Sequence, residues 1–294
     1  MTFSVNTNVG AAAALQALNA TSRGLANVQS RINSGLIVSS TKDDSSSFSI
    51  AQNLRGNLSD LKAVTSSLNR AKSVTDVAVA GAEQISDAVN QLRTLAKQAA
   101  DDGVSADSRA AYNKDFTALR DQITTIVSSA EFNGTNLLKT SGGTISALQS
   151  LSNLAVGSGT TFTPDVLTVA NFQLDLPATE TPSTGVGTGV LGKDSQIDTP
   201  EKAKKAIDTL NTMAVTLSGK LSDLGSAARK IDNQITFTSK LSDTIESGIG
   251  NLVDADLAKE SAKLQALQVK QQLGVQALSI ANQAPQSITS LFRS

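Results

Sequence analysis

The residues best suited to chemistry in this sequence are Asp43 and Asp44, two adjacent carboxylates that follow Lys42. Paired carboxylates can act as general acid and base or bind a metal ion, but adjacent side chains on a helix point in different directions. The sequence has no His and no Cys, which removes the commonest general base and the thiolate ligands. We therefore expect a charged turn that caps a helix, and we predict no catalytic and no metal-binding residue.

Other ligand-binding functions are also disfavoured by the sequence. The glycine-rich residues 185–192 lack the Lys-Ser/Thr ending of a phosphate loop, so we expect a surface loop there and no cofactor. A formal net charge of −1 provides no basic stripe for a nucleic acid. The sequence contains no apolar run of about 18 residues, so we expect no membrane insertion.

The most unusual feature of the sequence is the lack of charge at its two ends. Residues 1–22 and 271–292 contain no Asp, Glu, Lys or Arg, although charged residues make up 17% of the whole. Terminal segments are normally polar and frayed, because nothing there needs burying. Uncharged, apolar-patterned ends predict surfaces that are buried against each other and against other copies of the chain. The start of the chain also lacks the features of a cleaved signal peptide, so if the protein leaves the cell, we expect it to use another route.

Apolar residues repeat at helical spacing through most of the chain. We expect the first helix to begin after Asn8 and end at Gly35, and the second to cover residues 45–100, about 80 Å at 1.5 Å per residue. A third helix should end at Ala130, and a fourth should begin at Pro200 with Thr199 as its N-cap. The last should run from about Val253 to Asn282 and end before Pro285.

Two sets of apolar residues define the predicted contact surfaces. The residues expected to mediate assembly, on the terminal helices, are Leu18, Leu25, Val28, Ile32, Leu257, Leu264, Leu267, Leu273 and Leu278. The residues expected to form the seam of a helical rod are Ile85, Val89, Leu92, Ile207, Leu210, Leu217, Leu221, Leu224, Ile231 and Ile235. The rod seam alternates spacings of three and four, which is typical of coiled-coil packing.

Residues 139–198 differ in composition, being rich in Thr, Ser and Gly. Alternating apolar residues from Leu167 to Leu176 predict one or two short hairpins, and residues 179–192 predict a loop. We therefore predict a mainly α fold, an elongated hairpin of long coiled-coil-like helices with paired terminal helices and a small β-rich insert. The expected regions are an N-terminal arm (1–42), a rod (43–138), the insert (139–198), the returning rod (199–250) and a C-terminal arm (251–294).

Motifs in the arms and in the rod resemble those of bacterial flagellins. The N-terminal motifs are Val5-Asn6-Thr7-Asn8, Arg31-Ile32-Asn33-Ser34-Gly35-Leu36, Ser40-Thr41-Lys42-Asp43-Asp44 and Phe132-Asn133-Gly134 with Leu137-Leu138. The C-terminal motifs are Asp254-Ala255-Asp256-Leu257-Ala258, Gln271-Gln272-Leu273-Gly274 and Ala281-Asn282-Gln283-Ala284-Pro285-Gln286, followed by Leu291-Phe292-Arg293. The resemblance covers residues 1–140 and 200–294, and it implies that the arms form the inner tube of a filament, the rods the next shell and the insert the outward part.

The resemblance also implies a function and partners. The chain would be a structural subunit and not an enzyme, exported by the flagellar type III apparatus and polymerised outside the cell into the filament used for swimming. Implied partners are other copies of the chain, the hook–filament junction protein, the filament cap and an export chaperone. The alternative is a hook–filament junction protein, which has similar arms. A membrane-binding translocator is disfavoured, because helices that lie on membranes usually carry Lys or Arg on their polar face.

Two further expectations concern the arms and a host receptor. Ordering about 40 residues costs about 1–2 kcal/mol each in backbone entropy, so we expect each arm to be disordered in the monomer and to fold on assembly. By resemblance, Gln91, Arg93 and Thr94 lie where the vertebrate innate flagellin receptor binds. Gln91 and Thr94 stand where activating flagellins have Arg and Glu. Losing both charges at an interface centre can cost several kcal/mol, so we expect weak receptor activation.

Overall fold

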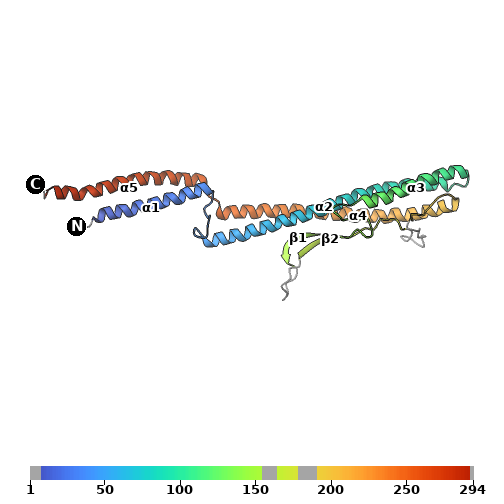
Figure 1. The fold of residues 1–294 in the computed structure, drawn as a ribbon, viewed down its shortest axis with the longest axis horizontal. Coiled ribbons are helices and arrows are strands. Elements are labelled where there is room, and N and C mark those ends of the chain that lie inside the picture. The colour runs from blue at the N-terminus through green and yellow to red at the C-terminus, as the bar shows by residue number, and fades with distance from the viewer. Residues whose placement is uncertain (1–7, 154–163, 178–190, 292–294) are drawn as a thin grey trace, which may run out of the picture. The chain divides into compact units, whose positions relative to one another are not determined.

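The computed structural model describes residues 8–153, 164–177 and 191–291, and over these the protein is mainly helical, as the sequence predicted (Figure 1). The helices are α1 (Val9–Ser34), α2 (Ser45–Ala99), α3 (Ala106–Ser129), α4 (Pro200–Val253) and α5 (Leu257–Leu291). Strands β1 (Ile145–Asn153) and β2 (Pro164–Val169) form an antiparallel pair. The chain divides into two compact units, one of Met1–Leu58 with Asp243–Ser294 and the other of Ser59–Ser242.

Local capping explains where most helices begin and end. The side chain of Asn8 accepts a hydrogen bond from the backbone N–H of Ala11 at the start of α1. At its end, Gly35 adopts φ 72°, and its N–H donates to the carbonyl of Arg31. The hydroxyl of Thr199 accepts from the N–H of Lys202 at the start of α4. These boundaries confirm the sequence-based prediction.

The C-terminal helices differ from that prediction in two places. Helix α5 begins at Leu257 and not near Val253, because Asp256 N-caps it by accepting from the N–H groups of Ala258 and Lys259. Helix α5 also continues through Pro285 to Leu291, so the predicted end was wrong. Proline has no N–H to donate to the carbonyl four residues earlier, which here belongs to Ala281. That carbonyl instead accepts a hydrogen bond from the side-chain Nδ2 of Asn8, at 2.8 Å.

In the first unit, α1 and α5 lie side by side and antiparallel (Figure 1). Small residues allow the two helices to approach closely, since a Cβ added to Gly274 would lie 3.3 Å from Leu18. Gly24 faces Leu267 in the same way, at 3.6 Å. A small core of Val38, Ala51, Ile249 and Val253 joins the segment after α1 to the adjacent ends of α2 and α4. The terminal helices are therefore paired, as the sequence predicted.

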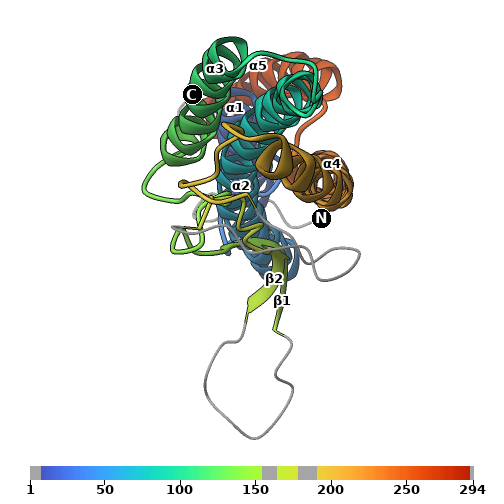
Figure 2. The ribbon, with the colours of Figure 1, turned by 90° about the vertical axis from the view of Figure 1, so that its right-hand side faces the viewer.

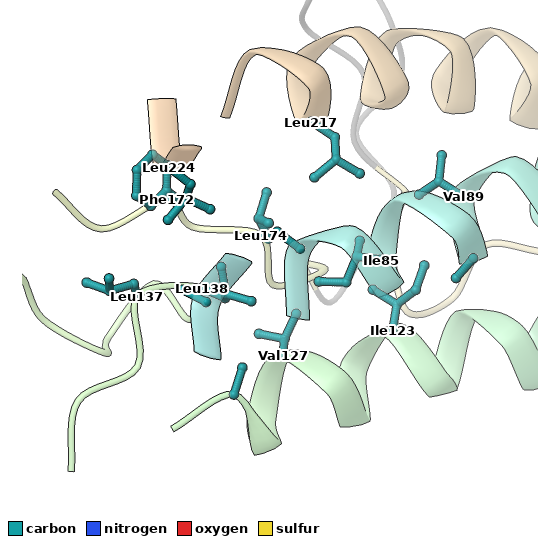
Figure 3. Packing of buried hydrophobic residues seen from close by; sticks show 14 of the residues in the cluster. Ile85, Val89, Ile123, Val127, Leu137, Leu138, Phe172, Leu174, Leu217 and Leu224 are labelled. Atoms are coloured by element: carbon teal, nitrogen blue, oxygen red, sulfur yellow. The ribbon is translucent and has the colours of Figure 1, made fainter. Parts of the chain in front are cut away.

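In the second unit, α2, α3 and α4 lie side by side with the β-hairpin on one side (Figure 2). The segments that flank the hairpin contribute to the same hydrophobic core as the helices. Figure 3 shows Leu138 and Leu174 on the side of Ile85 and Val127, and Phe172 on the side of Leu224. Among the described residues of these segments, the buried apolar members of this core are Leu137, Leu138, Ile145, Ala147, Val169, Phe172, Leu174, Leu176, Leu191 and Ile197.

The structure confirms the hairpin predicted for the insert but not the strand predicted as far as Leu176. A hairpin is present, but β2 ends at Val169, and residues 170–177 are not a strand. Their apolar side chains alternate because Phe172, Leu174 and Leu176 turn into the helical core, and Gln173 between them adopts φ 51°. The predicted loop at 179–192 falls almost entirely outside the described residues. Gly192 is buried, and its N–H donates to the hydroxyl of Ser195.

Candidate assembly surface on the paired terminal helices

The predicted assembly residues lie mostly in the seam between α1 and α5. Val28 is buried, and Leu18, Leu25, Ile32, Leu264, Leu267 and Leu278 are half-buried. Two of the predicted residues, Leu257 and Leu273, are instead exposed, at 50% and 57%. The apolar stripe of the sequence thus mainly identifies the contact between the two arms of one chain.

A second apolar surface lies on the outer faces of the two helices. Its exposed members are Val9, Leu15, Val269, Leu273, Val275 and Ile280, and Ile280 is 68% exposed. Single exposed apolar residues are ordinary, but a set of them on an uncharged helix pair indicates a surface that another protein covers. Apart from Leu273, periodicity did not reveal these positions, because it mainly selects the face that is buried within the chain. The absence of charge from residues 271–292 was the signal that did.

Asn8 links the ends of the two arms by using both polar atoms of its side chain. Oδ1 caps α1 through Ala11, while Nδ2 donates to the Ala281 carbonyl that Pro285 leaves without a partner. Neither role alone requires asparagine, since serine or aspartate also caps helices. The combination needs one acceptor and one donor on a short side chain, which asparagine provides.

Replacing Asn8 with Asp should weaken the pairing of the arms. The aspartate keeps the capping oxygen but loses the donor, and it places a negative charge beside the Ala281 carbonyl. We expect a loss of about 1–2 kcal/mol, measured as a lower disassembly temperature of filaments made from the variant. Asn69→Asp adds the same charge to an exposed site on α2, outside the arms, and serves as the control. Equal disassembly temperatures for the two variants would contradict this role.

Charged residues resume where the paired helices approach the rest of the unit. Glu260 is 3% exposed, and its Oε1 lies 2.5 Å from Lys263 Nζ and 3.8 Å from Arg31 Nη1. Burial of a carboxylate is tolerated where cations neutralise it. Arg23 and Lys270 end the uncharged stretches, and this cluster lies beyond them on the same two helices.

Asp43 and Asp44, the candidate acid pair, accept hydrogen bonds from neighbouring groups of the chain. The hydroxyl and N–H of Ser39, together with the N–H of Ser40, donate to Asp43 and lower the pKa of its carboxyl below the usual value. The hydroxyl of Ser47 and the N–H groups at the start of α2 lower the pKa of Asp44 in the same way. Both carboxylates are thus engaged by a turn and a helix start, which is the charged cap that we expected.

The predicted rod residues are brought together in the core of the second unit. Ile85, Val89, Leu92, Leu210, Leu217, Leu224 and Ile231 are buried, and Ile207, Leu221 and Ile235 pack against them partly buried. The three residues of the expected receptor region lie near the end of α2. Gln91 and Thr94 are exposed, while Arg93 is half-buried and its Nε has no hydrogen-bond partner among the residues that the structure describes.

Sequence reasoning missed three buried polar residues that organise this unit. Arg109 donates to the carbonyls of Ala99, Asp101 and Val104, the first of which ends α2. Arg120 donates to the carbonyl of Ser195, and the Asn136 side chain bonds the Val127 carbonyl and the Leu138 N–H. These hydrogen-bond partners are main-chain groups, so the pattern of side chains in the sequence could not predict the bonds.

Comparison with known proteins assigns most of the chain to one family. Residues 5–142 match the bacterial flagellin N-terminal helical region, and residues 205–292 match the bacterial flagellin C-terminal helical region. The chain is 43% identical to flagellin FljM of Caulobacter vibrioides over 290 residues, which cover 99% of this chain and 98% of that protein. It is 35% identical to a flagellin of Brucella melitensis over 294 residues, which cover 99% of each.

A solved structure supports the fold alone. It is that of a putative flagellar hook-associated protein from Vibrio parahaemolyticus, which is 13% identical and has a TM-score of 0.53. The match covers 72% of this chain and all of that chain. Within the described residues, none of the helices is both long and apolar enough to span a membrane.

Proposed function

The chain belongs to the bacterial flagellins, and on this basis we propose that it is a structural subunit that polymerises into the flagellar filament for swimming. The observation that carries this proposal is the uncharged outer surface of α1 and α5, with Leu15, Leu273 and Ile280 exposed. Exposed apolar residues on an uncharged helix pair indicate a surface that other copies of the chain cover. Full-length identity to flagellins favours this role over that of a junction protein.

The proposed arrangement assigns a place to each region. The arms at 1–42 and 251–294 form the inner tube, and the rod at 43–138 and 199–250 forms the next shell. The insert at 139–198 lies outward, although Phe172 and Leu176 anchor it to the rod core. Lys72 of α2 and Asp232 of α4, 2.7 Å apart, lie at the same level of the rod.

The proposed route and partners follow from the same family membership. The chain is exported through the flagellar type III apparatus, held before export by a chaperone and added beneath a distal cap. The hook–filament junction protein is its partner at the base, and the filament lies outside the cell. The role is structural, without catalysis.

Assembly of the purified chain tests this function. We expect monomers to elongate filament fragments, as seen by electron microscopy. Hydrogen exchange should show protection of residues 1–35 and 260–290 in filaments but not in monomers, because each arm buries enough apolar surface only among neighbours. Chains that never elongate fragments would contradict the proposed function. Protection of the arms in the monomer would contradict folding on assembly.

We also propose that the exposed Gln91 and Thr94 make the chain a weak ligand of the vertebrate innate flagellin receptor. Neither side chain offers the charge that a salt bridge needs. A cell reporter assay with depolymerised protein measures this. Full activation would contradict it.

A further inference from the structure

The second unit carries a shallow groove between α2 and α3. Its volume is about 380 Å³, and its apolar lining includes Val77, Ala80, Gly81 and Ile126. Gly81 lets Leu138 and Ala130 pack closely against α2 beside the groove, because a Cβ added there would lie 2.9 Å and 3.2 Å from them. Small residues and an apolar floor suit the entry of one large side chain.

The same unit exposes an aromatic residue on a different helix. Phe237 of α4 is 57% exposed, although large apolar side chains such as phenylalanine are usually buried. Phenylalanine is also scarce in this chain, with 8 among 294 residues. Lys230 lies seven residues before it and Lys240 three residues after it, so all three share one face of α4. Phe237 is therefore an apolar knob between two cations.

The charges around the knob and the groove are opposite. On α2, residues 76–91 contain Asp76, Glu83 and Asp87 and no basic residue, and on α3 residues 121–131 contain two acids and no basic residue. On α4, residues 229–240 contain three basic residues, and the single acid, Asp232, is paired with Lys72 of the same chain. Complementary charges of this kind steer association and fix its register.

The knob cannot enter the groove of its own chain. Helices α2 and α4 run antiparallel, as the pairs Lys72–Asp232 and Lys204–Asp102 show. Phe237 lies beyond Asp232 in one direction along the rod, while Val77–Gln84 lie beyond Lys72 in the other. The two features are thus about 10–17 residues apart along the axis, roughly 15–25 Å at 1.5 Å per residue.

We propose that Phe237 of one copy docks in the α2–α3 groove of a second copy, with Lys230 and Lys240 facing Glu83 and Asp87. Because the knob and the groove are different surfaces, the contact is heterologous, and their displacement along the rod shifts each copy along the axis relative to the last. Such a contact extends a helical polymer. The inference rests on the proposed function and identifies one lateral contact of the filament.

Cross-linking of engineered cysteines tests the contact, because the chain has no Cys of its own. Chains with Ala80→Cys are copolymerised with chains carrying Asn233→Cys, one turn from Phe237 on the same face, and treated with a short bismaleimide. We expect a covalent dimer, and we expect Phe237→Ala in the second chain to remove it. The control is Ser239→Cys, an exposed position on the opposite side of α4. Filaments in which Ser239→Cys cross-links as well as Asn233→Cys would overturn the contact.

Charge reversal provides an independent test. Lys230→Glu with Lys240→Glu should raise the critical concentration for assembly about ten-fold, because it places like charges opposite each other. Glu83→Lys with Asp87→Lys in the same chain should restore assembly, while circular dichroism of each monomer checks its fold. Absence of rescue would overturn the contact but leave the proposed function intact. Failure of the unsubstituted chain to polymerise would instead overturn the proposed function.

Discussion

Removal of residues 1–34 should leave a folded Ser59–Ser242 unit that forms no filaments. The deletion removes α1, which covers the seam face of α5 through Leu18, Leu25 and Val28. The second unit keeps its own core of α2, α3 and α4, so its stability should change little. We expect complete loss of pelletable polymer in a sedimentation assay, with the helical circular dichroism and cooperative unfolding of the rod retained.

Point substitutions test whether polymerisation needs the uncharged outer surface of the arms, with both arms still present. Leu15→Lys with Val275→Lys adds charge to the exposed outer surface without touching the seam. Burying each unpaired cation among neighbours is strongly unfavourable, so we expect these chains also to remain monomeric. Val166→Lys changes an exposed apolar residue on β2 and should polymerise normally. Normal filaments from the truncated chain or from the Leu15 and Val275 variant would contradict an inner position for the arms.

Replacing Arg109 with Met should destabilise the rod by about 2–4 kcal/mol. Arg109 is 7% exposed and donates three hydrogen bonds to carbonyls at and just after the end of α2. Methionine fills similar space but donates none, which leaves the buried Ala99 carbonyl unpaired at the negative end of the helix dipole. Urea unfolding followed by circular dichroism measures the free energy of unfolding.

Arg109→Lys distinguishes charge from geometry. Lysine keeps the positive charge near the helix end, but a single ammonium cannot span the carbonyls of Ala99, Asp101 and Val104 as the planar guanidinium does. We expect an intermediate loss of stability. Arg229→Met, at an exposed site on α4, should be close to neutral. A stability of Arg109→Met equal to that of the unsubstituted protein would contradict a structural role for these bonds.

The helices could be predicted because their determinants are local. Asn8, Gly35 and Thr199 cap or end helices through groups three or four residues away, and the spacing of apolar residues selects the buried face. The same local reasoning failed at Pro285. The donor that compensates for its missing N–H comes from Asn8, which is 273 residues away from Ala281 along the chain.

The sequence by itself determined that the chain is mainly helical, that its uncharged ends pair and that it belongs with flagellins. Periodicity, caps and the distribution of charge carry the first two conclusions, since each depends on neighbours along the chain, and the motifs that resemble those of flagellins carry the third. Only the tertiary structure decided which apolar residues remain exposed, such as Ile280 and Phe237, and which polar residues become buried, such as Arg109. Burial depends on contacts between segments distant in sequence, and residue type alone does not specify those contacts.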